Sequence, residues 1–270
     1  MHKLNQNHKS NKYLDKLIEK DKSYWLYGIN AGIAALRNKE RQCLEILCAK
    51  NVLQKYKKEL ENYSNNKNLK LNESSLEKIN SIVGKETIHQ GLAIKLKPLI
   101  NSDIKKIIDK EVNSKKMIVA LDQVKDPRNV GAIIRSAAAL GCIGIIMTDR
   151  NSPNETGVMA KSASGALEII PISRVKNLSR ELEKLKKSGF WVLGLSTFGE
   201  NLSDIKYFDQ PIVLVIGSES EGLRELTKKN CDNLINIPIS KTSKKLGLDS
   251  LNAASAASIA IYSVLFNQKS

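Results

Sequence analysis

Residues 212–223 read Ile-Val-Leu-Val-Ile-Gly-Ser-Glu-Ser-Glu-Gly-Leu, an unbroken apolar run that ends in an acidic turn bounded by two glycines. A strand that is apolar at every position is typical of a parallel sheet with helices on both faces. Gly217 and Gly222 permit close approach of a ligand to the backbone at the carboxyl end of this strand. The turn has no Walker lysine and no GxGxxG pattern, and its two glutamates disfavour a triphosphate. The two glutamates favour a cationic or hydroxyl-bearing ligand. The alternative is that this segment binds no ligand and is a polar turn whose glutamate complements a helix dipole.

Apolar runs and helical periodicity alternate on both sides of this turn. The predicted strands are 117–121, 143–147, 169–172, 191–195, 212–216 and 234–237, and the predicted helices are 129–140, 155–164, 178–187 and 251–266. This alternation predicts an α/β domain with a parallel sheet over residues 117–270.

A shorter alternation comes first in the chain. Its predicted strands are 44–48 and 91–96, and its predicted helices lie around 33–36 and at 52–60 and 76–83. We therefore expect a small α/β domain at 24–98. Residues 1–23 are interpreted as a basic flexible arm with a short helix at 13–20, and 99–116 as a charged linker.

The chain is strongly basic, with 43 Lys and Arg against 28 Asp and Glu, a formal net charge of +15 in 270 residues. Such a field favours an anionic partner, with nucleic acid ahead of a membrane surface, although codon bias could also enrich lysine. Residues 1–98 hold 19 basic and 10 acidic side chains, a net +9, against +4 for 117–270. The first third is thus the expected place for an anion.

The four cysteines are Cys43, Cys48, Cys142 and Cys231. They form no CxxC pair and lie in or beside apolar runs, which favours buried free thiols in a reducing cytosol over a metal site. Residues 1–23 lack the apolar core of a secretory signal, and Arg135 with two glycines interrupts the apolar stretch 130–148. We expect a soluble, cytoplasmic protein that spans no membrane.

A second motif follows the strand predicted at 117–121. Residues 126–131, Asp-Pro-Arg-Asn-Val-Gly, open a helix, and a strand-to-helix turn offers free backbone N–H groups to an anionic or polar ligand. Asn129 stands where an N-cap would stand, so helix capping is the alternative interpretation. Arg135 interrupts a helix otherwise suited to burial, where a guanidinium needs an anionic or carbonyl partner.

A third motif joins Ile237-Pro238-Ile239, a lysine-rich loop and Ser250-Leu251-Asn252, which opens a helix of alanine and serine. Ser250 could simply cap this helix, with Asn252 in its first turn. Each motif is a weak signal alone. All three together, in this order and at strand ends, are a strong signal.

Together the three motifs resemble those of the SpoU/TrmH branch of the SPOUT RNA methyltransferases, over residues 117–267. The resemblance implies a parallel sheet with a C-terminal deep trefoil knot, an exception to the rule that folds are unknotted. It also implies bound S-adenosyl-L-methionine, a homodimer, and methyl transfer to a ribose 2′-hydroxyl of RNA. Residues 24–97 resemble the small (L30e-like) substrate-binding domain of the subgroup that methylates a 23S rRNA guanosine, with Tyr27–Ala31 and His89–Gly91 matching its two ends.

The resemblance also assigns residues by position. It implies catalytic positions at Asn129, Arg135, Glu219, Ser250 and Asn252. It implies cofactor contacts at Ser196, Thr197, Gly217, Ile237 and Leu251, and it requires no metal. Arg135 is the family's usual proton acceptor, but a guanidinium rarely loses its proton, so stabilising the oxyanion or a phosphate is an equal alternative.

The loop before Ser250 is longer than the family's usual pattern and carries Lys241, Lys244 and Lys245, which we expect to contact RNA phosphate. Two other functions stay open: a tRNA 2′-O-methyltransferase, and an inactive RNA-binding or ribosome-assembly factor. The extra N-terminal domain favours rRNA over tRNA. The presence of Arg135, Glu219 and Asn252 disfavours an inactive protein.

Overall fold

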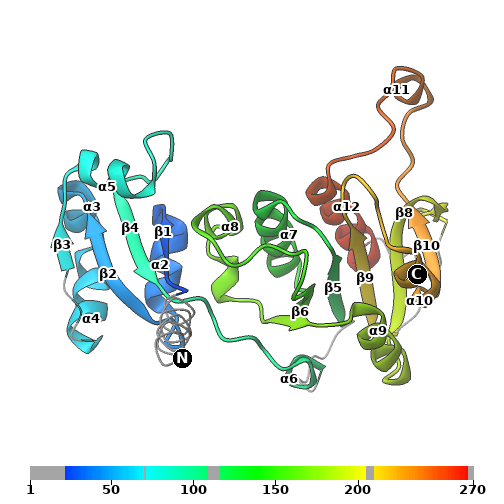
Figure 1. The fold of residues 1–270 in the computed structure, drawn as a ribbon, viewed down its shortest axis with the longest axis horizontal. Helices are drawn as coiled ribbons and strands as arrows, with labels where there is room; N and C mark the ends of the chain where they lie inside the picture. Colours follow the sequence, from blue (N-terminus) through cyan, green and yellow to red (C-terminus); the bar gives the residue numbers. More distant parts are fainter. Residues whose placement is uncertain (1–21, 68, 70, 109–115, 205–209, 267–270) are drawn as a thin grey trace, which may run out of the picture. The chain divides into compact units, whose positions relative to one another are not determined.

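The computed structural model describes residues 22–67, 69, 71–108, 116–204 and 210–266, and the helix predicted at 13–20 lies outside them. The chain divides into two compact units, Met1–Ile100 and Asn101–Ser270 (Figure 1). Among the described residues, no helix combines the length and apolarity needed to span a bilayer.

The first unit contains a four-stranded mixed sheet in the order β1-β4-β2-β3. Its strands are β1 (Tyr24–Tyr27), β2 (Cys43–Cys48), β3 (Leu71–Glu73) and β4 (Leu92–Leu96), and its helices are α2 (Ile29–Arg37), α3 (Lys50–Lys55), α4 (Lys57–Lys67) and α5 (Leu76–Val83). Strand β4 runs antiparallel to β1 and β2, whereas β2 and β3 are parallel. The sequence did not predict β1 or β3, which have only four and three residues. The single helix predicted at 52–60 is two helices, because the backbone leaves the helical region at Tyr56.

The second unit contains a six-stranded sheet in the order β10-β8-β9-β5-β6-β7, and all its neighbouring strands are parallel. Its strands are β5 (Met117–Asp122), β6 (Gly144–Thr148), β7 (Ile172–Val175), β8 (Trp191–Asn201), β9 (Ile212–Gly217) and β10 (Asn233–Asn236). Its helices are α6 (Ile104–Ile108), α7 (Pro127–Ala139), α8 (Gly157–Ala163), the 3-10 helix η1 (Ala166–Glu168), α9 (Leu178–Lys187), α10 (Glu225–Asn230), α11 (Lys241–Lys245) and α12 (Ala253–Phe266).

The two central strands explain why the apolar runs in the sequence are continuous. Every residue of β5 and β9 is buried. Ile118 and Val213 pack with Leu182 of α9 in one core cluster. Helices α7 and α12 pack together, and a 2.7 Å hydrogen bond joins the hydroxyls of Ser136 and Ser258. The predicted α/β architecture with a parallel sheet is confirmed; the deep knot stays a prediction.

Several boundaries differ from those predicted. Strand β7 begins at Ile172 rather than at 169, because η1 occupies 166–168 just before it. Strand β8 continues to Asn201, and α10 and α11 were not predicted. Residues 99–116, predicted as a linker, include α6, whose Ile107 is 1% exposed within the core of the second unit.

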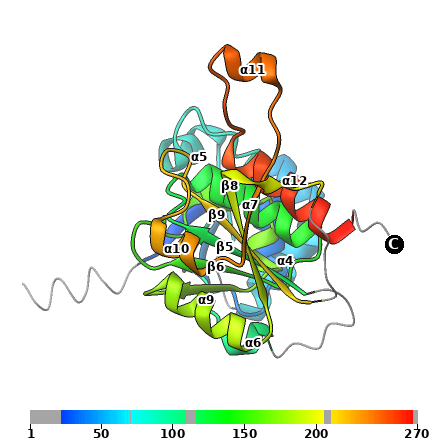
Figure 2. The ribbon, with the colours of Figure 1, turned by 90° about the vertical axis from the view of Figure 1, so that its right-hand side faces the viewer.

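The three motifs follow strands whose carboxyl ends share one edge of the second sheet. The first motif follows β5, the second follows β9, and the third follows β10. Figure 2 shows the segment around α11 projecting away from the rest of the second unit. The edge that carries the motifs is the usual place for a ligand in a parallel α/β sheet.

Candidate functional site

Helix α7 begins with a side-chain cap, but the capping residue is not the one that the sequence suggested. Asp126 is the N-cap, and its carboxylate accepts the backbone N–H of Arg128 at 2.8 Å. Asn129 as N-cap was therefore wrong: it lies inside the first turn and is 8% exposed. Its amide is left for contacts outside the helix.

Those contacts join all three motifs. The Asn129 amide donates to Glu219 Oε1 at 2.8 Å, and the Asn252 amide donates to the same oxygen at 2.7 Å. The Asn252 amide also donates to Asn129 Oδ1 at 3.0 Å, and the backbone N–H of Ala253 donates to Glu219 Oε1 at 3.3 Å. We call Asn129, Glu219 and Asn252 the amide–carboxylate cluster. Residues far apart in the chain thus share one hydrogen-bond network.

The third motif positions its asparagine by capping α12. Asn252 Oδ1 accepts the backbone N–H groups of Ala254 and Ser255 at 3.0 and 3.4 Å. Ser250 as the helix cap was therefore wrong. Its hydroxyl is exposed and donates to Asp249 at 3.3 Å.

The acidic turn is held in a tight loop that presents Glu219. Ser218 and Gly222 exchange two backbone hydrogen bonds, of 3.1 and 2.9 Å. A side chain at Gly217 would place its Cβ 2.2 Å from the carbonyl carbon of Gly222, so only glycine fits there. Gly222 has a φ of +66°, which favours glycine as well.

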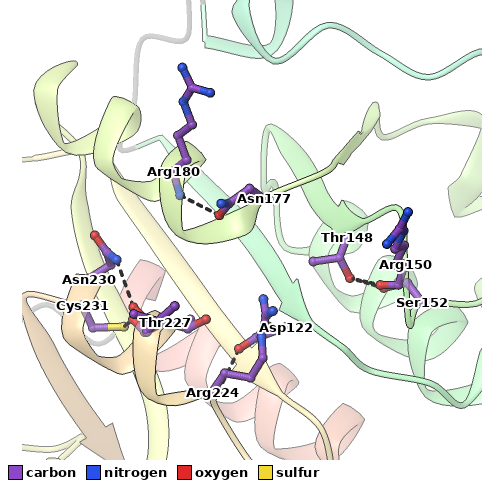
Figure 3. Close-up of polar contacts among 11 residues, drawn as sticks. Asp122, Thr148, Arg150, Ser152, Asn177, Arg180, Arg224, Thr227, Asn230 and Cys231 are labelled. Carbon is purple, nitrogen blue, oxygen red and sulfur yellow. Dashed lines mark hydrogen bonds and ion pairs between the residues drawn. The ribbon is translucent and has the colours of Figure 1, made fainter.

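An ion pair between a buried carboxylate and a partly exposed arginine holds the far end of this loop (Figure 3). Asp122 ends β5 beside Gly217 of β9, and its side chain is fully buried. Its carboxylate accepts the backbone N–H of Arg224 at 3.0 Å and the Arg224 guanidinium at 2.7 Å. Asp122 therefore lies beside the start of the loop through strand pairing and holds its end through its carboxylate. The sequence analysis missed this pair, although a charge directly after a fully apolar strand was a usable signal.

A cavity of about 530 Å³ opens beside the cluster. Its lining includes all five residues expected to contact a cofactor, namely Ser196, Thr197, Gly217, Ile237 and Leu251, together with Glu219 and Ser250. Ser196 and Thr197 were expected after the β8 strand, which is wrong, because β8 extends past them to Asn201. Ile237, expected inside the last strand, follows β10 instead.

The remaining predicted residues neither line this cavity nor bond to the amide–carboxylate cluster. Arg135 is exposed on α7, and its guanidinium makes no hydrogen bond or ion pair within the described part of the chain, so the anionic or carbonyl partner that the sequence analysis required is not found there. Lys241 and Lys245 are exposed on α11, and the backbone of Lys244 belongs to the same helix. In the described ranges, no group of three or more His, Cys, Asp or Glu could hold a metal ion.

Two protein families match the chain. The SpoU rRNA Methylase family matches residues 116–262, and the family described as RNA 2′-O ribose methyltransferase substrate binding matches residues 25–101. The chain belongs to the SpoU rRNA methylase family. YacO of Bacillus subtilis, assigned to the TrmH family of tRNA/rRNA methyltransferases, is 31% identical over 89% of this chain and 94% of its own length.

Some relatives are matched over only about half of their own length. An uncharacterized tRNA/rRNA methyltransferase of Synechocystis, slr0955, is 40% identical over 67% of this chain but only 46% of its own length. The chain spans about half the length of the first curated relatives that it matches. Among solved structures, the SpoU methyltransferase AviRb of Streptomyces viridochromogenes, crystallised with AdoMet, has a TM-score of 0.71 at 22% identity, covering 92% of this chain and 91% of its own. This likeness confirms the fold.

Proposed function

We propose that the protein transfers a methyl group from S-adenosyl-L-methionine to a ribose 2′-hydroxyl of RNA, with a guanosine of 23S rRNA as the substrate. The observation that carries the proposal is the amide–carboxylate cluster, which joins all three motifs beside a cavity lined by the five expected cofactor positions. Membership of the SpoU rRNA methylase family supports the reaction.

The chemistry of the cavity fits this cofactor. Apolar Leu195, Ile216 and Ile237 suit a purine ring, while the carboxylates of Glu219 and Asp249 suit the positive sulfonium and ammonium groups. The backbone at positions 217, 237 and 251 would hold the cofactor, and Ser196 and Thr197 would line its site. When bound, the cofactor would supply a methyl group already activated by its sulfonium.

The protein's own residues must align and activate the ribose hydroxyl, a weak nucleophile while it keeps its proton. Glu219 Oε1 already accepts three hydrogen bonds, so this oxygen holds the two asparagine amides in place, and Oε2 would be the oxygen available to a ligand. Arg135, exposed and cationic, would stabilise the developing oxyanion or the neighbouring phosphate. Ser250, on the cavity wall, would orient the same groups by its hydroxyl.

The choice of rRNA over tRNA rests on the first unit. Residues 25–101 match a substrate-binding family of RNA 2′-O ribose methyltransferases, and the first 98 residues carry the largest excess of positive charge. A tRNA substrate is the second candidate, because the relatives are named as tRNA/rRNA methyltransferases.

A homodimer is part of the proposal. Ile259, Tyr262 and Phe266 of α12 are 42%, 52% and 56% exposed, and the two aromatic rings stack with centroids 5.3 Å apart. Exposed apolar groups that share one helix favour an interface between copies. Size-exclusion chromatography with light scattering should give twice the 30.0 kDa chain mass, and Tyr262→Glu should lower it. A monomer in the unaltered protein would contradict this part.

The test of the reaction is direct. The purified protein would be incubated with S-adenosylmethionine and unmodified 23S rRNA or tRNA transcripts, and ribose methylation mapped by mass spectrometry of nuclease fragments. We expect one methylated ribose in 23S rRNA, lost in Arg135→Ala and kept in the control Arg180→Ala, an exposed arginine on α9. Methylation of tRNA alone would overturn the rRNA assignment. Cofactor binding without transfer to either RNA would favour an inactive RNA-binding factor.

The lysines of α11 have a separate test. If Lys241, Lys244 and Lys245 contact phosphate, replacing all three by alanine should lower the slope of log affinity against log salt by about two for a single-stranded target. An unchanged slope would remove α11 from the RNA-binding surface.

A further inference from the structure

Strand β8 leaves its ladder with β10 for five residues. Leu234 and Ile235 are consecutive residues of β10. Their partners on β8 are Gly194 and Glu200, which are six positions apart. The intervening residues, 195–199, remain within β8 but form an excursion from its pairing with β10. Four of them, 195–198, line the cavity beside Glu219.

Specific contacts fix this excursion at its base. A Cβ at Gly199 would lie 2.4 Å from the backbone nitrogen of Ile235, so the chain packs there without a side chain. The Asn236 amide donates to the Gly199 carbonyl, and the backbone N–H of Phe198 donates to Ser196 Oγ at 3.3 Å. The excursion is therefore a built feature of the cavity wall.

Phe198 stands on this wall with 92% of its surface exposed. An aromatic ring in water forgoes the favourable free energy of burial, so such a ring is a candidate for contact with a partner. A ring that covered a ligand inside the cavity would be partly enclosed by the cavity walls, and Phe198 is not. The ring of Phe198 is thus part of the cavity wall and is accessible to a partner from solvent.

We propose that Phe198 is a positioning residue that stacks on a nucleobase of the substrate RNA next to the target ribose. The inference rests on the proposed function, because a ribose whose 2′-oxygen reaches the cavity brings its own base, or the adjacent one, to the rim. Stacking on aromatic side chains is the common way in which proteins hold bases splayed out of single-stranded RNA. The ring would hold the nucleotide while the amide–carboxylate cluster aligns the hydroxyl.

The experiment compares four variants in steady-state methylation of the RNA that the unaltered protein methylates, at saturating S-adenosylmethionine. Phe198→Ala should raise the KM for RNA about tenfold, within the range known for loss of one stacked base. Phe198→Trp should restore it, whereas Phe198→Leu, apolar but not aromatic, should not. The matched control is Ile169→Ala, since Ile169 is 74% exposed and does not line the cavity.

Calorimetric binding of S-adenosylhomocysteine separates RNA from cofactor contacts. We expect the same dissociation constant in Phe198→Ala as in the unaltered protein. An unchanged KM for RNA in Phe198→Ala, full restoration by Phe198→Leu, or weaker S-adenosylhomocysteine binding with unchanged KM would each overturn the inference. Failure of the unaltered protein to methylate any RNA would instead sink the proposed function, so the two failures are distinguishable.

Discussion

The two units of the chain use their buried polar groups differently. In the first unit Arg41 is 1% exposed, its guanidinium donates to the Lys97 carbonyl at 3.0 Å, and its own carbonyl accepts the Tyr63 hydroxyl at 3.0 Å. Burial raises the pKa of Tyr63 well above its usual range. His89 lies between Asn80 and the backbone N–H of Gly91, each at 3.1 Å. These groups bond to each other and to backbone.

In the second unit the amide–carboxylate cluster lies at the solvent edge of the sheet instead. Asn129 is buried, but Glu219 and Asn252 are exposed beside a cavity. A buried arginine or histidine that is hydrogen-bonded to neighbouring backbone and side chains is explained by the fold. A convergent polar set at the mouth of a cavity is better explained by a ligand. Substitutions in the two regions should therefore affect different measurements.

The largest expected effect separates catalysis from stability. Glu219→Ala removes the oxygen that holds both asparagine amides, and we expect kcat to fall by about a thousandfold, the upper range for loss of one preorganised group. Arg41→Met should lower the free energy of unfolding and leave kcat within about twofold once folded protein is compared. Urea titration and methylation of the proposed rRNA substrate provide the two readouts. Equal losses of kcat in both variants would remove the distinction.

The second prediction concerns the ion pair beneath the acidic loop. Arg224→Ala leaves Asp122 buried without its cation, which should lower the free energy of unfolding by about 3 kcal/mol. The value is at the low end for a buried pair because Arg224 is 41% exposed. Arg224→Lys should retain part of the stability. The Lys228–Glu225 pair offers the control, because Lys228→Ala should lower the free energy of unfolding by less than about 1 kcal/mol. Urea denaturation that shows equal losses for Arg224→Ala and Lys228→Ala would contradict the assignment.

The sequence predicted the strands of the second unit better than those of the first. Continuous apolar runs fixed the parallel strands of the second unit, because two-sided burial leaves no polar alternation. The short edge strands β1 and β3 of the first unit were missed, since three or four residues carry little periodicity. Asn129, Glu219 and Asn252 were found through motif order and resemblance. The caps at Asp126 and Asn252 were misassigned, because several capping residues stand together before each helix and only geometry selects one.

The thiols give a third, smaller contrast. Burial, aided by Glu73, raises the pKa of Cys48 to about 11, and burial raises that of Cys142 to about 12. Only thiolates react with iodoacetamide, so both thiols should label slowly in the folded protein at pH 9. Each rate should rise about tenfold per pH unit from 8 to 10 in the folded state and level off above pH 9 in urea. Peptide mass spectrometry measures the labelling rate of each cysteine. Rapid labelling of both thiols in the folded protein would contradict the prediction.

The smallest expected effect is on the free energy of unfolding when a side-chain helix cap is removed from either unit. Ser75 accepts the backbone N–H of Lys78 at 3.3 Å at the start of α5, and Asp126 accepts that of Arg128 at 2.8 Å at the start of α7. Replacing either by alanine should lower the free energy of unfolding by about 1 kcal/mol. Only Asp126→Ala should also lower kcat, because the first turn of α7 carries Asn129 into contact with Glu219. The methylation assay on both variants decides this. If Asp126→Ala costs stability but keeps full kcat, the cluster holds Asn129 in place without help from its helix cap.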